Sequence, residues 1–167
     1  MITNKISYKR IVILLVSLVT IPLTFYVSTK VDFSFKYYIQ EKTFNEENLI
    51  SYLKKTRIRF PYIVLAQAKL ESGNYTSFIF ENNHNLFGMR HPNIRTTTSL
   101  GKRFGYAYYE TWEESVVDYG IYSSKYIRDM SSEEDYYEFL DKYYAQDPDY
   151  SKKLKTIVGD IKSKGIF

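Results

Sequence analysis

A run of uncharged, mostly apolar residues near the N-terminus constrains this chain more than any other feature of its sequence. The run extends from Ile11 to Val27, and three basic residues precede it, Lys5, Lys9 and Arg10. As a helix it would span about 26 Å, close to the roughly 30 Å hydrocarbon core of a bilayer. We therefore predict a transmembrane signal anchor over residues 11–29, which leaves one folded domain in the rest of the 167 residues.

The charge around this run predicts where the folded domain works. Because the basic residues come first, the positive-inside rule keeps residues 1–10 in the cytoplasm and carries the later residues across the membrane. No small-residue cleavage site follows the run, which favours a retained anchor over a cleaved and secreted form. We predict a membrane-anchored protein whose domain is extracytoplasmic, in the cell envelope, behind a linker at residues 30–43.

The sequence of residues 44–167 predicts a mainly α (α+β) domain with one small β lobe. Asn45 is a candidate cap for a helix to about Lys55, and Pro61 suits the first turn of a helix that Gly73 ends. Glycines, prolines and a threonine run in residues 86–109 favour a hairpin or irregular lobe. Further helices follow, at the capping-box pairs Thr111 with Glu114 and Ser131 with Glu134, and after Asp147-Pro148. This layout is typical of a lysozyme-like domain.

One carboxylate in the second of these helices has a position that suits acid catalysis. Glu71 falls in the last turn of a helix whose other side chains are largely apolar. Apolar surroundings disfavour the charged carboxylate and raise its pKa toward the value that a general acid needs. Glu71 is therefore the candidate general acid, although an exposed residue in a last helical turn would explain the same position.

The residues around Glu71 belong to a longer pattern. From Ala66 the chain reads AQAKLESGNYTSFIFENNHNLFGMR, and later segments read GYAYY at 105–109, WEESV at 112–116 and YAQDPDY at 144–150. This pattern resembles the glucosaminidase family of peptidoglycan hydrolases, glycoside hydrolase family 73, with its flagellar and autolysin N-acetylglucosaminidases. The resemblance covers about residues 44–167. It implies a lysozyme-like fold and a glycosidase that acts on the peptidoglycan glycan strand.

The resemblance implies roles at matching positions. Glu71 would protonate the oxygen of the β-1,4 bond between N-acetylglucosamine and N-acetylmuramic acid. Asn85, Phe87 and Gly88 match the segment that lines the substrate groove in the family. Apart from the resemblance, the Tyr109 hydroxyl could orient the acetamido group of the substrate or the oxygen being protonated, unless Tyr109 is a core residue. A turn cap at Asn85 and a core position for Phe87 explain these residues equally well, so both interpretations stay open.

The second carboxylate that glycosidases usually use is missing from its expected place. Some family members carry it in the β lobe, but no Asp or Glu occurs between Leu86 and Tyr109. Glu110 is the nearest candidate, although its place before a helix suits a solvated residue. Tyr119 and Tyr144 could instead orient the reacting groups, unless they are core residues. A lytic transglycosylase and a non-catalytic peptidoglycan-binding module are therefore the alternatives to a hydrolase.

The formal charge of +4 favours an anionic partner. Four cations lie in the predicted lobe without acidic neighbours, Arg90, Arg95, Lys102 and Arg103. In an exported domain these cations would meet the lactyl and stem-peptide carboxylates of peptidoglycan rather than nucleic acid, and a merely solvated basic face is the alternative. With no cysteine and two histidines, we predict no metal site and no cofactor. A phage lysis protein would show the same features.

Overall fold

An asparagine cap and regular apolar spacing build the first helix of the described residues. The computed structural model describes residues 43–127 and 129–167. Helix α2 (Glu46–Thr56) begins after Asn45, whose side-chain oxygen accepts a hydrogen bond from the backbone nitrogen of Asn48 at 2.7 Å. Leu49 and Leu53, one turn apart on the same face, are fully buried. The predicted cap of this helix is confirmed.

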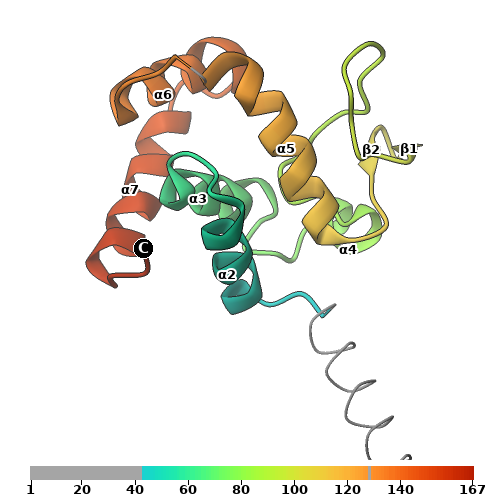
Figure 1. Ribbon diagram of the computed structural model, residues 1–167, viewed down its shortest axis with the longest axis horizontal. Coiled ribbons are helices and arrows are strands. Elements are labelled where there is room, and N and C mark those ends of the chain that lie inside the picture. The colour runs from blue at the N-terminus through green and yellow to red at the C-terminus, as the bar shows by residue number, and fades with distance from the viewer. Residues whose placement is uncertain (1–42, 128) are drawn as a thin grey trace, which may run out of the picture. The chain divides into compact units, whose positions relative to one another are not determined.

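Helix α3 (Pro61–Glu71) runs through the core and ends at the candidate acid. It begins at Pro61 as predicted, and six consecutive residues, 63–68, are buried, because other helices cover it on several sides. Figure 1 shows it in green beside the red helix α7 (Tyr150–Ser163). Gly73 adopts a left-handed φ of 58°, which lets the chain turn away after Glu71. The acid is thus held by the most buried helix in the described residues.

The small β element is an antiparallel hairpin within an otherwise irregular lobe. Strand β1 (Gly101–Arg103) pairs with β2 (Tyr106–Tyr108), so that Gly101 lies opposite Tyr108. Phe104 and Gly105 connect the strands with φ values of 53° and 85°, the two left-handed positions of a type I′ turn. The helix α4 (Phe78–Asn83) packs against β2. The predicted lobe is confirmed, with regular pairing over only three residues in each strand.

Neither of the two predicted capping pairs is found among the later helices of the described residues: Glu114 accepts a hydrogen bond from the backbone nitrogen of Glu110, not from that of Thr111. These helices otherwise lie where they were predicted. They are α5 (Trp112–Ile127), α6 (Glu133–Phe139), a π-helical turn η1 (Leu140–Tyr144) and α7. The capping box of α6 is formed by Ser132 and Asp135, whose side chains each bond to the other's backbone nitrogen, at 2.9 and 3.1 Å. The predicted pair of Ser131 with Glu134 is wrong, because the helix begins one residue later and Glu134 pairs with Lys155.

The described residues confirm a mainly helical architecture with a two-stranded sheet, consistent with a lysozyme-like domain. Within them, no helix has the length and apolar character that crossing a membrane requires. The predicted anchor at residues 11–29, the N-terminal segment 1–10 and the linker through residue 42 lie outside the described residues. Their assignments stay predictions.

Candidate active site

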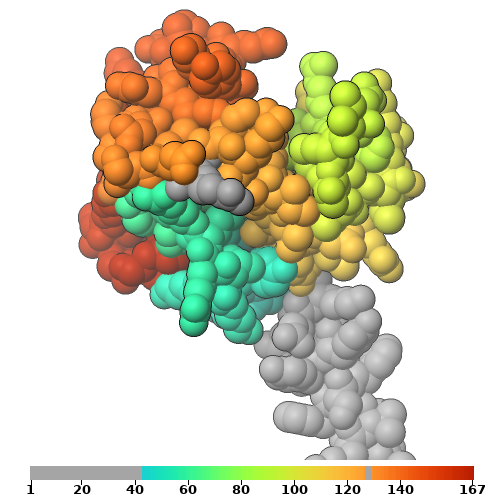
Figure 2. All heavy atoms as spheres, turned by 45° about the horizontal axis from the view of Figure 1, so that its top comes forward, coloured from blue at the N-terminus to red at the C-terminus, as the bar shows by residue number. Residues whose placement is uncertain are grey.

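An open groove of about 900 Å³ lies at the end of helix α3, within the size range of ligand-binding pockets. One wall comes from the loop of residues 85–95, and the other from residues 143–147 with Tyr150 of α7. In Figure 2 the yellow-green lobe stands beside the orange helical segment, with a hollow between them. Glu71 and Asp147 are the acidic side chains of the described chain that line this groove.

Glu71 lies at the inner end of the groove, partly buried. The hydroxyl of Tyr150 donates a hydrogen bond to Glu71 Oε1 at 2.7 Å. Burial raises the pKa of the Glu71 carboxyl above its ordinary value of 4.5, and the Tyr150 hydrogen bond offsets part of that rise. A carboxyl in this position stays protonated to higher pH than an exposed glutamate, which is what proton donation to a substrate requires.

Gly88 leaves space next to the candidate acid. Its φ is 59°, a conformation that side chains disfavour, and a Cβ at this position would lie 3.4 Å from Glu71 Oε2. The second carboxylate oxygen of Glu71 therefore faces the glycine backbone and the groove that both residues line. A substrate atom can approach this oxygen because no side chain projects from residue 88.

Asn85 holds the loop that forms this wall. Its amide nitrogen donates to the carbonyls of Met89 and Ala107, each at 2.9 Å, and its oxygen accepts from the backbone nitrogens of Met89 at 3.0 Å and Phe87 at 3.3 Å. Buried amides are costly unless they are satisfied in this way. Asn85 lines the groove. Because its side-chain hydrogen bonds all go to backbone atoms, Asn85 fixes the conformation of the loop that contains Gly88.

Phe87 and two tyrosines join the loop to the helical core. The Phe87 ring stacks on Tyr119, with centroids 4.4 Å apart, and both side chains are buried. The Tyr144 hydroxyl donates to the Phe87 carbonyl at 2.7 Å, while the Tyr144 side chain also lines the groove. Tyr119 lies in the core behind the groove, where its hydroxyl bonds to Gln67 of α3 at 2.6 Å.

Besides Tyr119, two of the predicted site residues lie away from the groove. The Glu110 side chain is exposed and absent from the groove lining, and the Glu110 backbone nitrogen donates to Glu114 at 2.9 Å. Tyr109 is buried and donates its hydroxyl to Asp118 at 2.8 Å. The structure therefore brings Glu71, Asn85, Phe87, Gly88 and Tyr144 together, and it places Glu110, Tyr109 and Tyr119 elsewhere.

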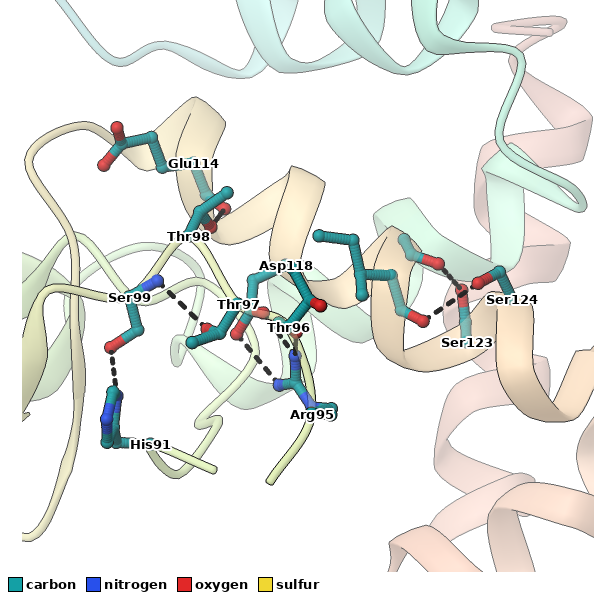
Figure 3. Close-up of polar contacts among 12 residues, drawn as sticks. His91, Arg95, Thr96, Thr97, Thr98, Ser99, Glu114, Asp118, Ser123 and Ser124 are labelled. Atoms are coloured by element: carbon teal, nitrogen blue, oxygen red, sulfur yellow. Dashed lines mark hydrogen bonds and ion pairs between the residues drawn. The ribbon is translucent and has the colours of Figure 1, made fainter. Parts of the chain in front are cut away.

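Two of the four predicted lobe cations, Arg95 and Arg103, have partners in the described residues. Arg95 forms a two-pronged ion pair with Asp118, which is fully buried on α5, as Figure 3 shows. Arg103 donates to the Asn82 carbonyl at 3.1 Å and lies over the Tyr108 ring. Figure 3 also shows Thr98 next to Glu114, whose carbonyl accepts from the threonine hydroxyl at 2.6 Å. The contacts of Arg95 and Thr98 fasten the lobe to α5.

Of the two other cations, Arg90 and Lys102, only Arg90 lines the groove in the described residues. It is exposed, it lines the groove, and it has no ion pair with any residue in 43–127 or 129–167. Lys102 is also exposed, but it lies outside the groove lining. In the same described ranges, no cluster of three or more His, Asp or Glu side chains is arranged to hold a metal ion.

Sequence reasoning missed three residues at the site. Tyr150 was part of a quoted motif without a role, and Asp147 beside it lines the groove, where Lys153 binds it at 2.6 Å and lowers the pKa of its carboxyl. Gln67 was passed over inside an apolar helix. It lies four residues before Glu71, so both side chains share one helix face, which is the signal that could have found it.

Comparison with known proteins identifies the family. A model of the glucosaminidase family, described as mannosyl-glycoprotein endo-beta-N-acetylglucosaminidase, matches residues 46–163, and the chain belongs to this family. The resemblance predicted from the sequence is confirmed.

Two individual proteins resemble this chain. An N-acetylmuramoyl-L-alanine amidase domain-containing protein of Staphylococcus aureus (strain NCTC 8325 / PS 47) is 30% identical over 120 residues, or 58% of this chain and 19% of that protein. The chain thus spans about a fifth of this relative. The catalytic domain of the autolysin Auto from Listeria monocytogenes superposes with a TM-score of 0.52 at 23% identity, over 72% of this chain and 82% of that domain, which shows a shared fold.

Proposed function

We propose that this protein hydrolyses the peptidoglycan glycan strand at the β-1,4 bond between N-acetylglucosamine and N-acetylmuramic acid, with Glu71 as the general acid. The observation that carries the proposal is a partly buried carboxyl with a raised pKa at the inner end of an open groove. Membership of the glucosaminidase family and the likeness to an autolysin support a glycan substrate in the cell wall.

In the proposed reaction Glu71 gives its proton to the glycosidic oxygen as that bond breaks, and the sugar ring develops oxocarbenium charge. Asp147 is the other acid in the described groove, and its pairing with Lys153 keeps it a carboxylate. In a second route, the acetamido group of the substrate itself stabilises the oxocarbenium charge on the sugar ring. At the alternate β-1,4 bond, whose anomeric carbon belongs to N-acetylmuramic acid, the 6-hydroxyl of that same sugar can attack the anomeric carbon in place of water. The protonated oxygen of the next sugar then leaves, and an anhydro end forms, as in a lytic transglycosylase.

The products distinguish these routes. We would incubate the full chain with purified peptidoglycan and analyse the released fragments by mass spectrometry. Reducing N-acetylglucosamine ends are the expected result, whereas anhydro ends would replace the hydrolase by a lytic transglycosylase. A folded protein that sediments with peptidoglycan but releases no fragments would contradict the enzyme and leave a wall-binding module.

Arg90 supplies the groove with a cation for an anionic substrate. Arg95 is paired with Asp118 and Asp147 with Lys153, whereas Arg90 lines the groove without an ion pair to any described residue. We propose that it binds a lactyl or stem-peptide carboxylate, since guanidinium groups form strong hydrogen bonds with carboxylates.

Arg90→Gln is expected to weaken binding of native glycan strands by about tenfold, the worth of one charge-assisted contact. Strands whose carboxylates have been converted to amides should bind the variant and the wild type equally. Binding is measured by sedimentation with purified strands. Lys102→Gln, which removes an exposed lobe cation outside the groove, is the matched control, and an equal loss in that variant would reduce Arg90 to general charge attraction.

We further propose that the domain acts outside the cytoplasmic membrane, where its polymer lies. This placement depends on the predicted anchor at residues 11–29 and its preceding basic residues. Protease treatment of intact cells, with antibody detection of the domain, tests it. A domain that stays protected until the membrane is broken would contradict the proposal.

A further inference from the structure

A continuous chain of hydrogen bonds leads from the helical core to the candidate acid. The hydroxyls of Tyr119 on α5 and Tyr136 on α6 lie 2.6 and 2.9 Å from Gln67 Oε1 and are also hydrogen-bonded to each other, so at least one of their two protons is donated to the amide oxygen. Gln67 Nε2 donates to the Tyr150 hydroxyl at 3.4 Å, and Tyr150 donates to Glu71 Oε1 at 2.7 Å. The chain thus connects side chains from four helices, and Gln67, Tyr119 and Tyr136 are fully buried.

The chemistry of the amide gives this chain a direction. An amide oxygen only accepts hydrogen bonds and an amide nitrogen only donates them. Because two hydroxyls meet at Gln67 Oε1, its nitrogen is left for Tyr150. The Tyr150 oxygen then accepts from Gln67, and its single proton is directed at Glu71 Oε1. A protonated Glu71 that accepts on Oε1 carries its own proton on Oε2.

The two oxygens of Glu71 have different surroundings. Oε1 faces Tyr150, on the side of α7, while Oε2 lies beside the Gly88 backbone, at the wall that both residues give to the groove. We infer that Gln67 is a positioning residue that acts through Tyr150 to keep the acidic proton of Glu71 on the oxygen facing the groove. This inference deepens the proposed function and rests on it for its catalytic consequence.

The other groups around Glu71 do not duplicate this control. The titratable side chains that face it are Tyr150 from α7 and Tyr144 from η1. The Tyr144 hydroxyl donates to the Phe87 carbonyl, so its proton is committed elsewhere. Four charged or titratable side chains from the loops also line the groove, Arg90, His91, Arg95 and Asp147. Glu71 has no hydrogen bond to any of these four within the described residues.

The first test reads the Glu71 carboxyl directly in the full chain. Carbon-13 NMR of labelled glutamate carboxyls follows its titration, and the signal is assigned by its loss in Glu71→Gln. Tyr150→Phe should raise the pKa of Glu71, because the carboxylate loses a hydrogen-bond donor. Gln67→Met should also raise it, because a released Tyr150 hydroxyl can turn and accept from the neutral acid.

The double variant separates positioning from general disturbance. If Gln67 acts through Tyr150, Gln67→Met combined with Tyr150→Phe should titrate like Tyr150→Phe alone. Additive shifts, or an unchanged pKa in Gln67→Met, would overturn the inference. Should Gln67→Met fail to fold, Tyr119→Phe with Tyr136→Phe removes both hydroxyls at the amide oxygen and should give the same shift. Tyr119→Phe alone keeps one donor and should leave the pKa unchanged.

The second test measures turnover. In Gln67→Met, kcat for strand cleavage should fall by about five- to tenfold, as expected for one misdirected hydrogen bond, while KM stays within about twofold. The alkaline limb of the pH profile should move upward with the pKa of Glu71. If the variants show the NMR shifts but the wild-type chain cleaves nothing, the proposed function is contradicted and the positioning role stands. An active wild-type enzyme whose variants show no shift in the pKa of Glu71 would support the proposed function and contradict the positioning role.

Discussion

Replacing Glu71 with glutamine is expected to lower the rate of glycan cleavage by about 10²- to 10⁴-fold, the usual contribution of a general acid. Glutamine has nearly the same shape, and its side-chain oxygen can still accept the hydrogen bond from Tyr150. It has no acidic proton to give to the glycosidic oxygen. The rate is measured as fragments released from purified peptidoglycan by the full chain.

Glu110→Gln is the matched control for that substitution, because it also removes a carboxylate while the Glu110 side chain is exposed and outside the groove lining. Its rate should equal that of the wild type. A loss as large as that in Glu71→Gln would show that Glu110 reaches the substrate and acts as a second acid. A Glu71→Gln variant that keeps the wild-type rate would refute the assignment of the general acid.

Glu71→Gln should be at least as stable as the wild type at neutral pH, although it is much less active. Because burial raises the pKa of Glu71, the folded state holds this proton more tightly than the unfolded chain, so stability falls as pH rises through the folded-state pKa. Glu71→Gln removes that penalty. Its free energy of unfolding should match or exceed that of the wild type at neutral pH, and the two should converge below the ordinary pKa of 4.5.

Replacing Arg95 with methionine is expected to lower the free energy of unfolding by about 2–4 kcal/mol, a buried-pair magnitude reduced for partial exposure of the arginine. The Asp118 side chain is fully buried, whereas 22% of the Arg95 side chain is exposed. Without Arg95, the Asp118 carboxylate keeps only the hydroxyl of Tyr109 among the partners described. Urea denaturation of the full chain, followed by tryptophan fluorescence, measures the change.

The reverse substitution should cost less. In Asp118→Asn the partly exposed Arg95 can turn toward water, so we expect a loss of about 1–2 kcal/mol. Adding Asp118→Asn to Arg95→Met should recover part of the stability, because no unpaired charge then stays buried. Equal and additive losses in the two single variants would contradict a buried ion pair that fastens the lobe to α5.

The features that were predicted from the sequence depend on neighbours along the chain. Asn45 caps a helix through a residue three positions away, and Pro61 starts a helix because its own ring fixes φ. Glu71 was placed in a last turn because Gly73 follows at once. The capping-box rule gave the wrong pair for α6. The consecutive serines and acids at 131–135 allow two capping registers, and the structure uses the later one.

The rest of the site depends on contacts between distant residues. Tyr150 lies 79 positions from Glu71 along the chain, and Tyr119 lies 52 positions from Gln67. No spacing rule predicts such pairs from one sequence. The lobe cations were misjudged for the same reason: Arg95 has no acidic neighbour nearby in sequence, but the fold places it against Asp118, which is 23 positions away.

The chain of hydrogen bonds that leads to Glu71 limits where this protein can be engineered for stability. Gln67, Tyr119 and Tyr136 are fully buried, so they belong to the packing of α3, α5 and α6 as much as to the groove. A library that varies the interior to raise the melting temperature would therefore sample losses of turnover at the same positions. Substitutions on the outer faces of α5 and α7 leave these side chains untouched, and thermostable variants are best sought there.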